Sequence, residues 1–180
     1  MEEKVNVWKT NLTGGVIMGV VAVIYSLLMY FFDLALNQTQ GYIFIVIQIA
    51  LLVYLLKSYR DNYCFGNITY GQSVGVGVII CLYSAIITAI FTYILYSFIA
   101  PELIDKQLAL AEEMLIKRGT PQAAVDAGMA LQRKLMTPGI LSLMSIFNNM
   151  FIGTIISLII SVFIKKEGNP LIDAPANKQI

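Results

Sequence analysis

Four long apolar stretches constrain this chain more than any other feature of its sequence. They cover approximately residues 13–32, 41–56, 73–99 and 139–164, and none of them contains a charged residue. A helix of about 20 apolar residues crosses the roughly 30 Å hydrocarbon core of a bilayer. The second stretch is the shortest, and it becomes long enough if Lys57 snorkels and Tyr59 lies at the interface. The sequence therefore predicts an all-α bundle of four transmembrane helices.

The first apolar stretch has one alternative interpretation, which is a cleaved signal peptide. The residues before it carry Glu2 and Glu3 beside Lys4 and Lys9. A signal peptide has a positively charged start and an apolar core of only about 7–15 residues, and this stretch is longer. We therefore expect the first stretch to remain in the protein as a membrane helix.

The placement of lysine and arginine predicts the orientation in the membrane, because cytoplasmic segments carry an excess of both. With the N-terminus inside, the cytoplasmic segments hold Lys4, Lys9, Lys57, Arg60, Lys165, Lys166 and Lys178. The first external loop, residues 33–40, holds no basic residue, and the second balances its basic residues with acidic ones. We expect a multi-pass protein of the cell inner membrane with both termini in the cytoplasm.

The segment between the third and fourth stretches, about residues 101–136, is predicted to form a helical hairpin outside the membrane. Pro101 is typical of a helix start, and Gly119 is typical of the residue that follows a helix end. Thr120 and Pro121 then fit the N-cap and the first residue of a second helix. Residues 1–166 thus form one membrane domain, and residues 167–180 are expected to be a disordered cytoplasmic tail.

The first helix of the predicted hairpin carries an apolar stripe that needs a cover. The stripe consists of Ile104, Leu108, Ala111 and Leu115. Three covers are conceivable: the second hairpin helix, the membrane surface and a partner protein. The stretch 102–116 contains four acidic residues, one lysine and no aromatic residue, which disfavours the membrane surface. We expect the stripe to pack on Val125, Met129 and Leu135, with a partner groove as the second choice.

Small residues recur every three or four positions along three of the predicted membrane helices. The positions that let backbones approach most closely are Gly15, Gly19, Gly77 and Gly153. In lipid, such stripes favour close helix association. Two interpretations stay open, namely packing between helices of one chain and a homodimer face, which would lie on the first helix.

The densest polar cluster is the predicted cytoplasmic loop that begins with Tyr59, Arg60 and Asp61. One interpretation is topological: basic residues fix the orientation, tyrosines line the interface, and Gly66 and Gly71 shape a turn. The other is a lipid-headgroup or partner contact, in which Arg60 offers its planar fork to a phosphate and Asp61 holds that fork in place.

The sequence gives no sign of catalytic or metal chemistry. The chain contains no histidine, and its two cysteines, Cys64 and Cys81, fit no zinc or redox spacing. The membrane stretches contain no charge that would mark an ion path, and Asn148 and Asn149 fit hydrogen bonds between helices better than a polar conduit. We expect no enzymatic activity, no cofactor and no metal. The net charge of +1 gives no reason to expect a nucleic-acid partner.

Several short motifs resemble a bacterial four-pass membrane family that is known only as a domain of unknown function. The likeness lies in Tyr59-Arg60-Asp61, in residues 66–72 (G-N-I-T-Y-G-Q), in residues 99–105, in residues 136–139 and in residues 153–166. It extends over about residues 8–166. In that family a second glycine often precedes the position of Gly66, where this chain has Phe65. The resemblance implies a four-helix inner-membrane protein and implies no activity.

Two functions lead after these exclusions, and an intramembrane enzyme comes third because the sequence contains no catalytic constellation. The first is a non-enzymatic scaffold or partner-binding protein that uses the hairpin or the Tyr59–Asp61 loop, either with another protein or as a homo-oligomer in the lipid bilayer. The second is a small oligomeric transporter or channel.

Overall fold

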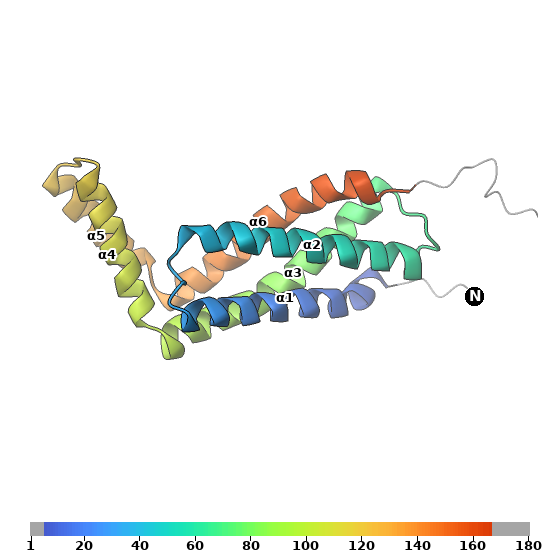
Figure 1. Ribbon diagram of the computed structural model, residues 1–180, viewed down its shortest axis with the longest axis horizontal. Coiled ribbons are helices and arrows are strands. Elements are labelled where there is room, and N and C mark those ends of the chain that lie inside the picture. Colours follow the sequence, from blue (N-terminus) through green and yellow to red (C-terminus); the bar gives the residue numbers. More distant parts are fainter. Residues whose placement is uncertain (1–5, 167–180) are drawn as a thin grey trace, which may run out of the picture.

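The computed structural model describes residues 6–166, apart from the side chain of Gln38, so the tail expected at 167–180 lies outside the described residues. The described chain is helical, with one isolated β-bridge. Its elements are α1 (Val7–Phe31), α2 (Gln38–Tyr63), α3 (Tyr70–Ile94), the π-helix η1 (Leu95–Ile99), α4 (Glu102–Lys117), α5 (Gln122–Leu135) and α6 (Pro138–Ile164). Figure 1 shows the four long helices side by side, with α4 and α5 extending beyond one end of them.

The prediction of four helices able to span a membrane is confirmed. The spans are Val7–Phe31, Thr39–Tyr63, Tyr70–Ile99 and Pro138–Ile164. The second helix extends beyond the apolar stretch 41–56, because α2 has 26 residues and continues past Leu56 through the polar segment to Tyr63. Tyr59, which was expected at the interface, is only 8% exposed and belongs to the core of the bundle.

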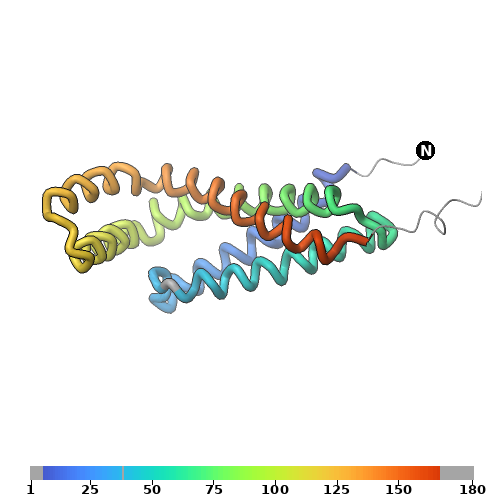
Figure 2. Tube along the Cα trace, turned by 90° about the horizontal axis from the view of Figure 1, so that it is seen from above, coloured from blue at the N-terminus to red at the C-terminus, as the bar shows by residue number. Residues whose placement is uncertain are grey.

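Helix α3 lies at the centre of the bundle and packs closely on α1 at one side and on α6 at the other (Figure 2). The four glycines that the sequence singles out lie at these two contacts. A Cβ atom added at Gly15 would overlap Tyr83 of α3, and one at Gly19 would lie 2.9 Å from Ile87. A Cβ at Gly77 would overlap Ser157 of α6, and one at Gly153 would lie 2.6 Å from the Sγ of Cys81. Since α3 covers Gly15 and Gly19, a second copy could reach this face of α1 only by displacing α3.

Hydrogen bonds join α3 and α6 along the length of their antiparallel contact. The hydroxyl of Tyr70 on α3 donates to the Leu158 carbonyl of α6 at 3.3 Å. In four further bonds the donor is a polar side chain of α6 and the acceptor lies on α3. The pairs are Ser142 Oγ to the Ala89 carbonyl (2.7 Å), Asn149 Nδ2 to Thr88 Oγ1 (3.2 Å), Ser157 Oγ to the Val74 carbonyl (3.2 Å) and Ser161 Oγ to Ser73 Oγ (2.9 Å). Where lipid replaces water, close packing and such bonds hold helices together.

Helices α4 and α5 form a hairpin with a small core of its own. Leu108 of α4 is buried with Val125 and Met129 of α5. Leu135, which was also expected in this contact, is 48% exposed. The start of α5 is shifted by one residue from the expectation, because Pro121 is the N-cap and Gln122 the first helical residue. Gly119 has φ +74°, the left-handed conformation that ends a helix and favours glycine.

Replacing Gly77 by leucine is expected to destabilise the bundle more than replacing its neighbour Val78 by leucine. Only the side chain at position 77 would enter the space that Ser157 occupies, whereas Val78 is partly exposed. Overpacking of this kind costs about 1–3 kcal/mol. The measurement is the unfolding temperature of each purified variant in detergent. Equal unfolding temperatures for the two variants would contradict the close approach of α3 to α6.

Candidate functional site

One end of the bundle gathers the start of α1, the connection between α2 and α3 and the end of α6 (Figure 1). The predicted Tyr59-Arg60-Asp61 cluster lies here, in the last turns of α2. This end also carries the basic residues Lys9, Lys57, Lys165 and Lys166. Both interpretations of the cluster, the topological one and the binding one, therefore concern this end of the bundle.

The guanidinium of Arg60 is engaged by other groups of the chain. Its Nε donates to Asp61 Oδ1 at 2.8 Å, and its Nη2 to Asp61 Oδ2 at 3.4 Å. Its Nη1 donates to the carbonyl oxygen of Ile164, the last residue of α6, at 3.4 Å. Asp61 thus orients the fork, as the binding interpretation required, but the fork joins α2 to α6. A phosphate would have to compete with both partners.

A second contact attaches the end of α6 to this end of the bundle. The backbone of Ile68, in the connection, and that of Lys166, just after α6, exchange two hydrogen bonds of 2.9 and 3.0 Å. The Ile68 side chain is buried in the core. Together with Arg60, this pair attaches the end of α6 to the connection between α2 and α3. The cluster therefore serves packing at this end of the bundle.

The connection turns at Phe65 and Gly66, which have φ +50° and +82°. The expectation that Gly71 also shapes this turn is wrong, because Gly71 lies in the first turn of α3. That helix starts earlier since Thr69 and Gln72 form a capping box, in which each side chain accepts a hydrogen bond from the other residue's backbone N–H. The Thr-x-x-Gln spacing is the signal that could have located this start.

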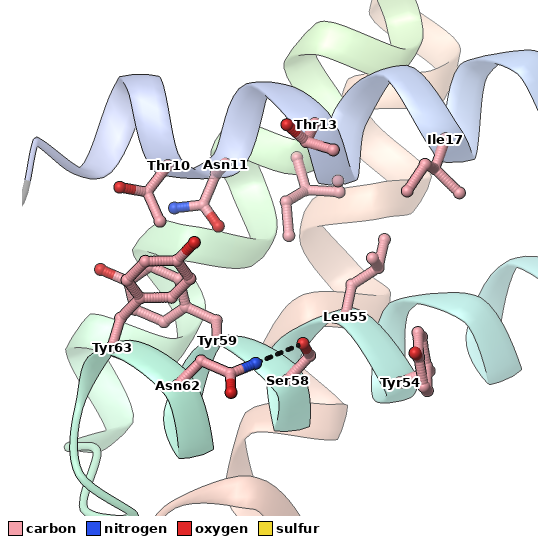
Figure 3. Close-up of a pocket in the computed structure, with 12 residues that line it drawn as sticks. Thr10, Asn11, Thr13, Ile17, Tyr54, Leu55, Ser58, Tyr59, Asn62 and Tyr63 are labelled. Atoms are coloured by element: carbon pink, nitrogen blue, oxygen red, sulfur yellow. Dashed lines mark hydrogen bonds between the residues drawn. The ribbon is translucent and has the colours of Figure 1, made fainter.

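A cavity of about 220 Å³ lies between α1 and α2 next to this end. Its polar lining comes from Thr10, Asn11 and Thr13 of α1 and from Tyr54, Ser58, Tyr59, Asn62 and Tyr63 of α2. Figure 3 shows Thr10 and Asn11 facing Tyr59 and Tyr63 across it, with Asn62 donating a 3.0 Å hydrogen bond to Ser58. Of these residues, the sequence singled out only Tyr59 as a site candidate. The signal that could have indicated this cavity is the set of polar residues that recur near one end of both helices.

The polar residues deeper in the bundle are used for packing. Asn149 donates to Thr88 and to the Ser145 carbonyl of its own helix, and Thr92 donates to the Thr88 carbonyl. Asn148 is exposed on the surface of α6. These contacts agree with the hydrogen-bonding interpretation of Asn149. Across residues 6–166, no three acidic, cysteine or histidine side chains gather as they would around a metal ion.

Replacing Arg60 by alanine is expected to loosen the end of α6, because both the Asp61 contact and the Ile164 carbonyl contact disappear. Lysine at this position should not restore them, since one ammonium group cannot reproduce the fork. We expect the free energy of unfolding to fall by about 1 kcal/mol. This is less than a buried hydrogen bond to a charged group contributes, because the pair is partly exposed. Amide hydrogen exchange at Ile68 and Lys166 measures the loosening. Lys57→Ala, at an exposed basic residue nearby, is the control, and exchange equal to that control would refute the proposed attachment.

Comparison with known proteins adds one match. The family model described as "Protein of unknown function (DUF4199)" covers residues 13–166, which includes α1 from residue 13 onward, the other three long helices and the α4–α5 hairpin. No curated protein and no solved structure matches the chain. The resemblance drawn from the short motifs is thereby confirmed, and the chain belongs to the DUF4199 family.

Proposed function

We propose that this protein is a multi-pass protein of the inner membrane that acts without catalysis, by binding a partner protein through the α4–α5 hairpin. In this arrangement the start of α1 and the end of α6 face the cytoplasm, and the hairpin lies outside the membrane on the other side. The observation that carries the proposal is a hairpin with its own core and with further apolar side chains exposed on its outside.

The orientation is supported by the charges at the two ends of the bundle. The end with residues 6–10, 57–72 and 165–166 carries five basic residues and the single acidic residue Asp61 among the residues that the structure describes. At the opposite end, the exposed Asp33 lies 3.9 Å from Lys106 of α4, so that the basic charge there is partly offset. An excess of lysine and arginine near the membrane favours the cytoplasmic side.

The hairpin exposes apolar residues in pairs that are one helical turn apart. Leu110 and Met114 of α4 are 38% and 46% exposed, and Leu131 and Leu135 of α5 are 60% and 48% exposed. Single exposed leucines are common on proteins, but paired ones on two short helices favour an interaction surface. The acidic residues of α4 and the lack of aromatic residues there disfavour the membrane surface as the partner. A protein with a complementary apolar groove fits these helices best.

The second candidate, a small oligomeric transporter or channel, has less support. A conduit would need polar side chains that face a water-filled path. The hydroxyl of Thr88 instead donates to the Ser84 and Ala85 carbonyls of α3 and accepts from Asn149. These groups are used for helix packing, so no specific observation favours transport.

The orientation predicts which positions a membrane-impermeant maleimide reaches in cells with a permeabilised outer membrane. Cysteine introduced at Lys117 of α4 should react in intact cells, and cysteine at Lys57 of α2 should react only after lysis. Both native cysteines are first replaced by alanine, although burial raises the pKa of the Cys64 thiol and slows its reaction at neutral pH. Labelling at position 57 without lysis would reverse the orientation.

The partner-binding proposal is tested by a photoreactive residue placed at Leu131 in living cells. We expect one covalent adduct with another protein, in high yield, because this exposed side chain lies in the proposed contact. The matched control is the same residue at Val125, which is fully buried in the hairpin and should give no adduct. The substitution Leu131→Asp should abolish capture of that protein without lowering the unfolding temperature. Adducts with lipid alone, or no adduct, would contradict the proposal.

A further inference from the structure

The cavity between α1 and α2 changes from polar to apolar along its length. Asn62 and Tyr63 line it near the end of the bundle, and Ile17 and Leu55 line it about two helical turns deeper. Two turns of helix correspond to about 11 Å. In a membrane this depth leads from the headgroup region into the hydrocarbon, so the cavity has the polarity of an amphiphile that enters from the bilayer.

Several polar atoms that line the cavity have unused hydrogen-bonding capacity. Among residues 6–166, the hydroxyl groups of Thr13, Tyr59 and Tyr63 make no hydrogen bond, and the amide of Asn11 uses only its nitrogen, which donates to the Val7 carbonyl at 2.8 Å. Asn11 and Tyr59 are themselves nearly buried, at 3% and 8% exposure. No buried polar side-chain atom is left without a partner, so the unbonded oxygens of these two residues must reach open space. For Asn11 that space is the cavity between α1 and α2, whereas Tyr59 lines both this cavity and a second one beside the start of α1. Asn11, Thr13 and Tyr63 are therefore the groups placed to bind a polar ligand here.

The cavity lining carries no charged side chain. Its donors and acceptors are hydroxyl groups of Thr, Ser and Tyr and the amides of Asn11 and Asn62, which suit hydroxyl and ester groups. A phosphate monoester would bring up to two negative charges into a site with no basic group to offset them. The cavity is also smaller than the 300–1,000 Å³ typical of drug-sized ligands, so it would hold a headgroup and leave long chains outside.

The mouth of the cavity faces outward from the bundle. Thr13 and Ile17 of α1 and Tyr54 of α2 line it and are exposed, with Tyr54 at 67%. Nothing in the described bundle covers α1 and α2 on this side, where α3 and α6 lie behind them (Figure 1). Acyl chains can therefore stay in the bilayer while a headgroup enters between the two helices.

We propose that the α1–α2 cavity binds an uncharged lipid whose headgroup carries hydroxyl groups, such as a diacylglycerol or its glycosylated form. The hydroxyl groups bind to Thr13, Ser58, Asn62 and the neighbouring tyrosines. The glycerol ester region follows toward Leu55, and the acyl chains pass Ile17 into the membrane. This site is separate from the α4–α5 hairpin, and it does not depend on the partner-binding proposal. It also differs from the phosphate site that the sequence suggested at Arg60.

The test is native mass spectrometry of the full-length protein, released from detergent that contains equal amounts of three lipids with the same acyl chains. The lipids are diacylglycerol, monoglycosyl diacylglycerol and phosphatidic acid. We expect at least one of the two uncharged lipids to be retained about tenfold more than phosphatidic acid. The stronger of the two identifies the source of the hydroxyl groups. Equal retention of all three lipids, or retention of phosphatidic acid alone, overturns the proposal.

Two variants locate the binding in the cavity. Ser58→Phe should abolish retention because the ring fills the space between α1 and α2. Thr13→Val changes an exposed residue with almost no change of shape, and loss of one hydrogen bond should reduce retention about fivefold. The matched control is Thr154→Val on α6, whose hydroxyl donates to the Met150 carbonyl of its own helix and lies outside the cavity. Retention by Thr13→Val equal to that of the control would place the lipid elsewhere on the protein and refute the site.

Discussion

The whole bundle depends on the close contact of α3 with its two neighbours. Apolar side chains gain little from meeting one another in a bilayer, because the lipid is as apolar as they are. The helices therefore need contacts that lipid cannot provide. Gly77 and Gly153 permit close approach of α3 and α6, and hydroxyl and amide groups such as those of Ser161 and Asn149 bond across the gap. Gly15 and Gly19 likewise permit close approach of α1 and α3. Among the described residues, no hydrogen bond joins these two helices.

The two ends of the bundle differ in the contacts that join the helices. At the end with residues 6 and 166, Arg60 and the Ile68–Lys166 bridge attach α6 to the α2–α3 connection, and the main apolar core lies close by. At the other end, α3 continues through the π-helix η1 into a hairpin with a separate core. The cavity lies at the end with residues 6 and 166. The main apolar core nearby fixes the positions of the helices that carry the polar residues of the cavity.

The sequence predicted the helices well and the site poorly, for a physical reason. A membrane helix needs a continuous apolar run, and capping residues such as Thr137 and Gly119 mark boundaries locally, so both can be read from neighbouring residues. The length of α2 was missed because Tyr59 belongs to the core although it lies two positions after the charged Lys57. The cavity was missed because it joins Asn11 to Asn62, and only the packing of α1 against α2 brings them together. The role of Arg60 likewise depends on the Ile164 carbonyl, 104 positions away.

The central position of α3 also sets the order in which the bundle can assemble during synthesis. Helices α1 and α3 can pair as soon as α3 has entered the membrane. The opposite face of α3, with Ser73 and Gly77, meets its partner only after the two hairpin helices and then α6 have left the ribosome. Until α6 arrives, the hydroxyl group of Ser73 and the shallow surface at Gly77 face lipid. A chain that stops before α6 would therefore expose to the cell's quality control the face of α3 that α6 covers in the complete protein.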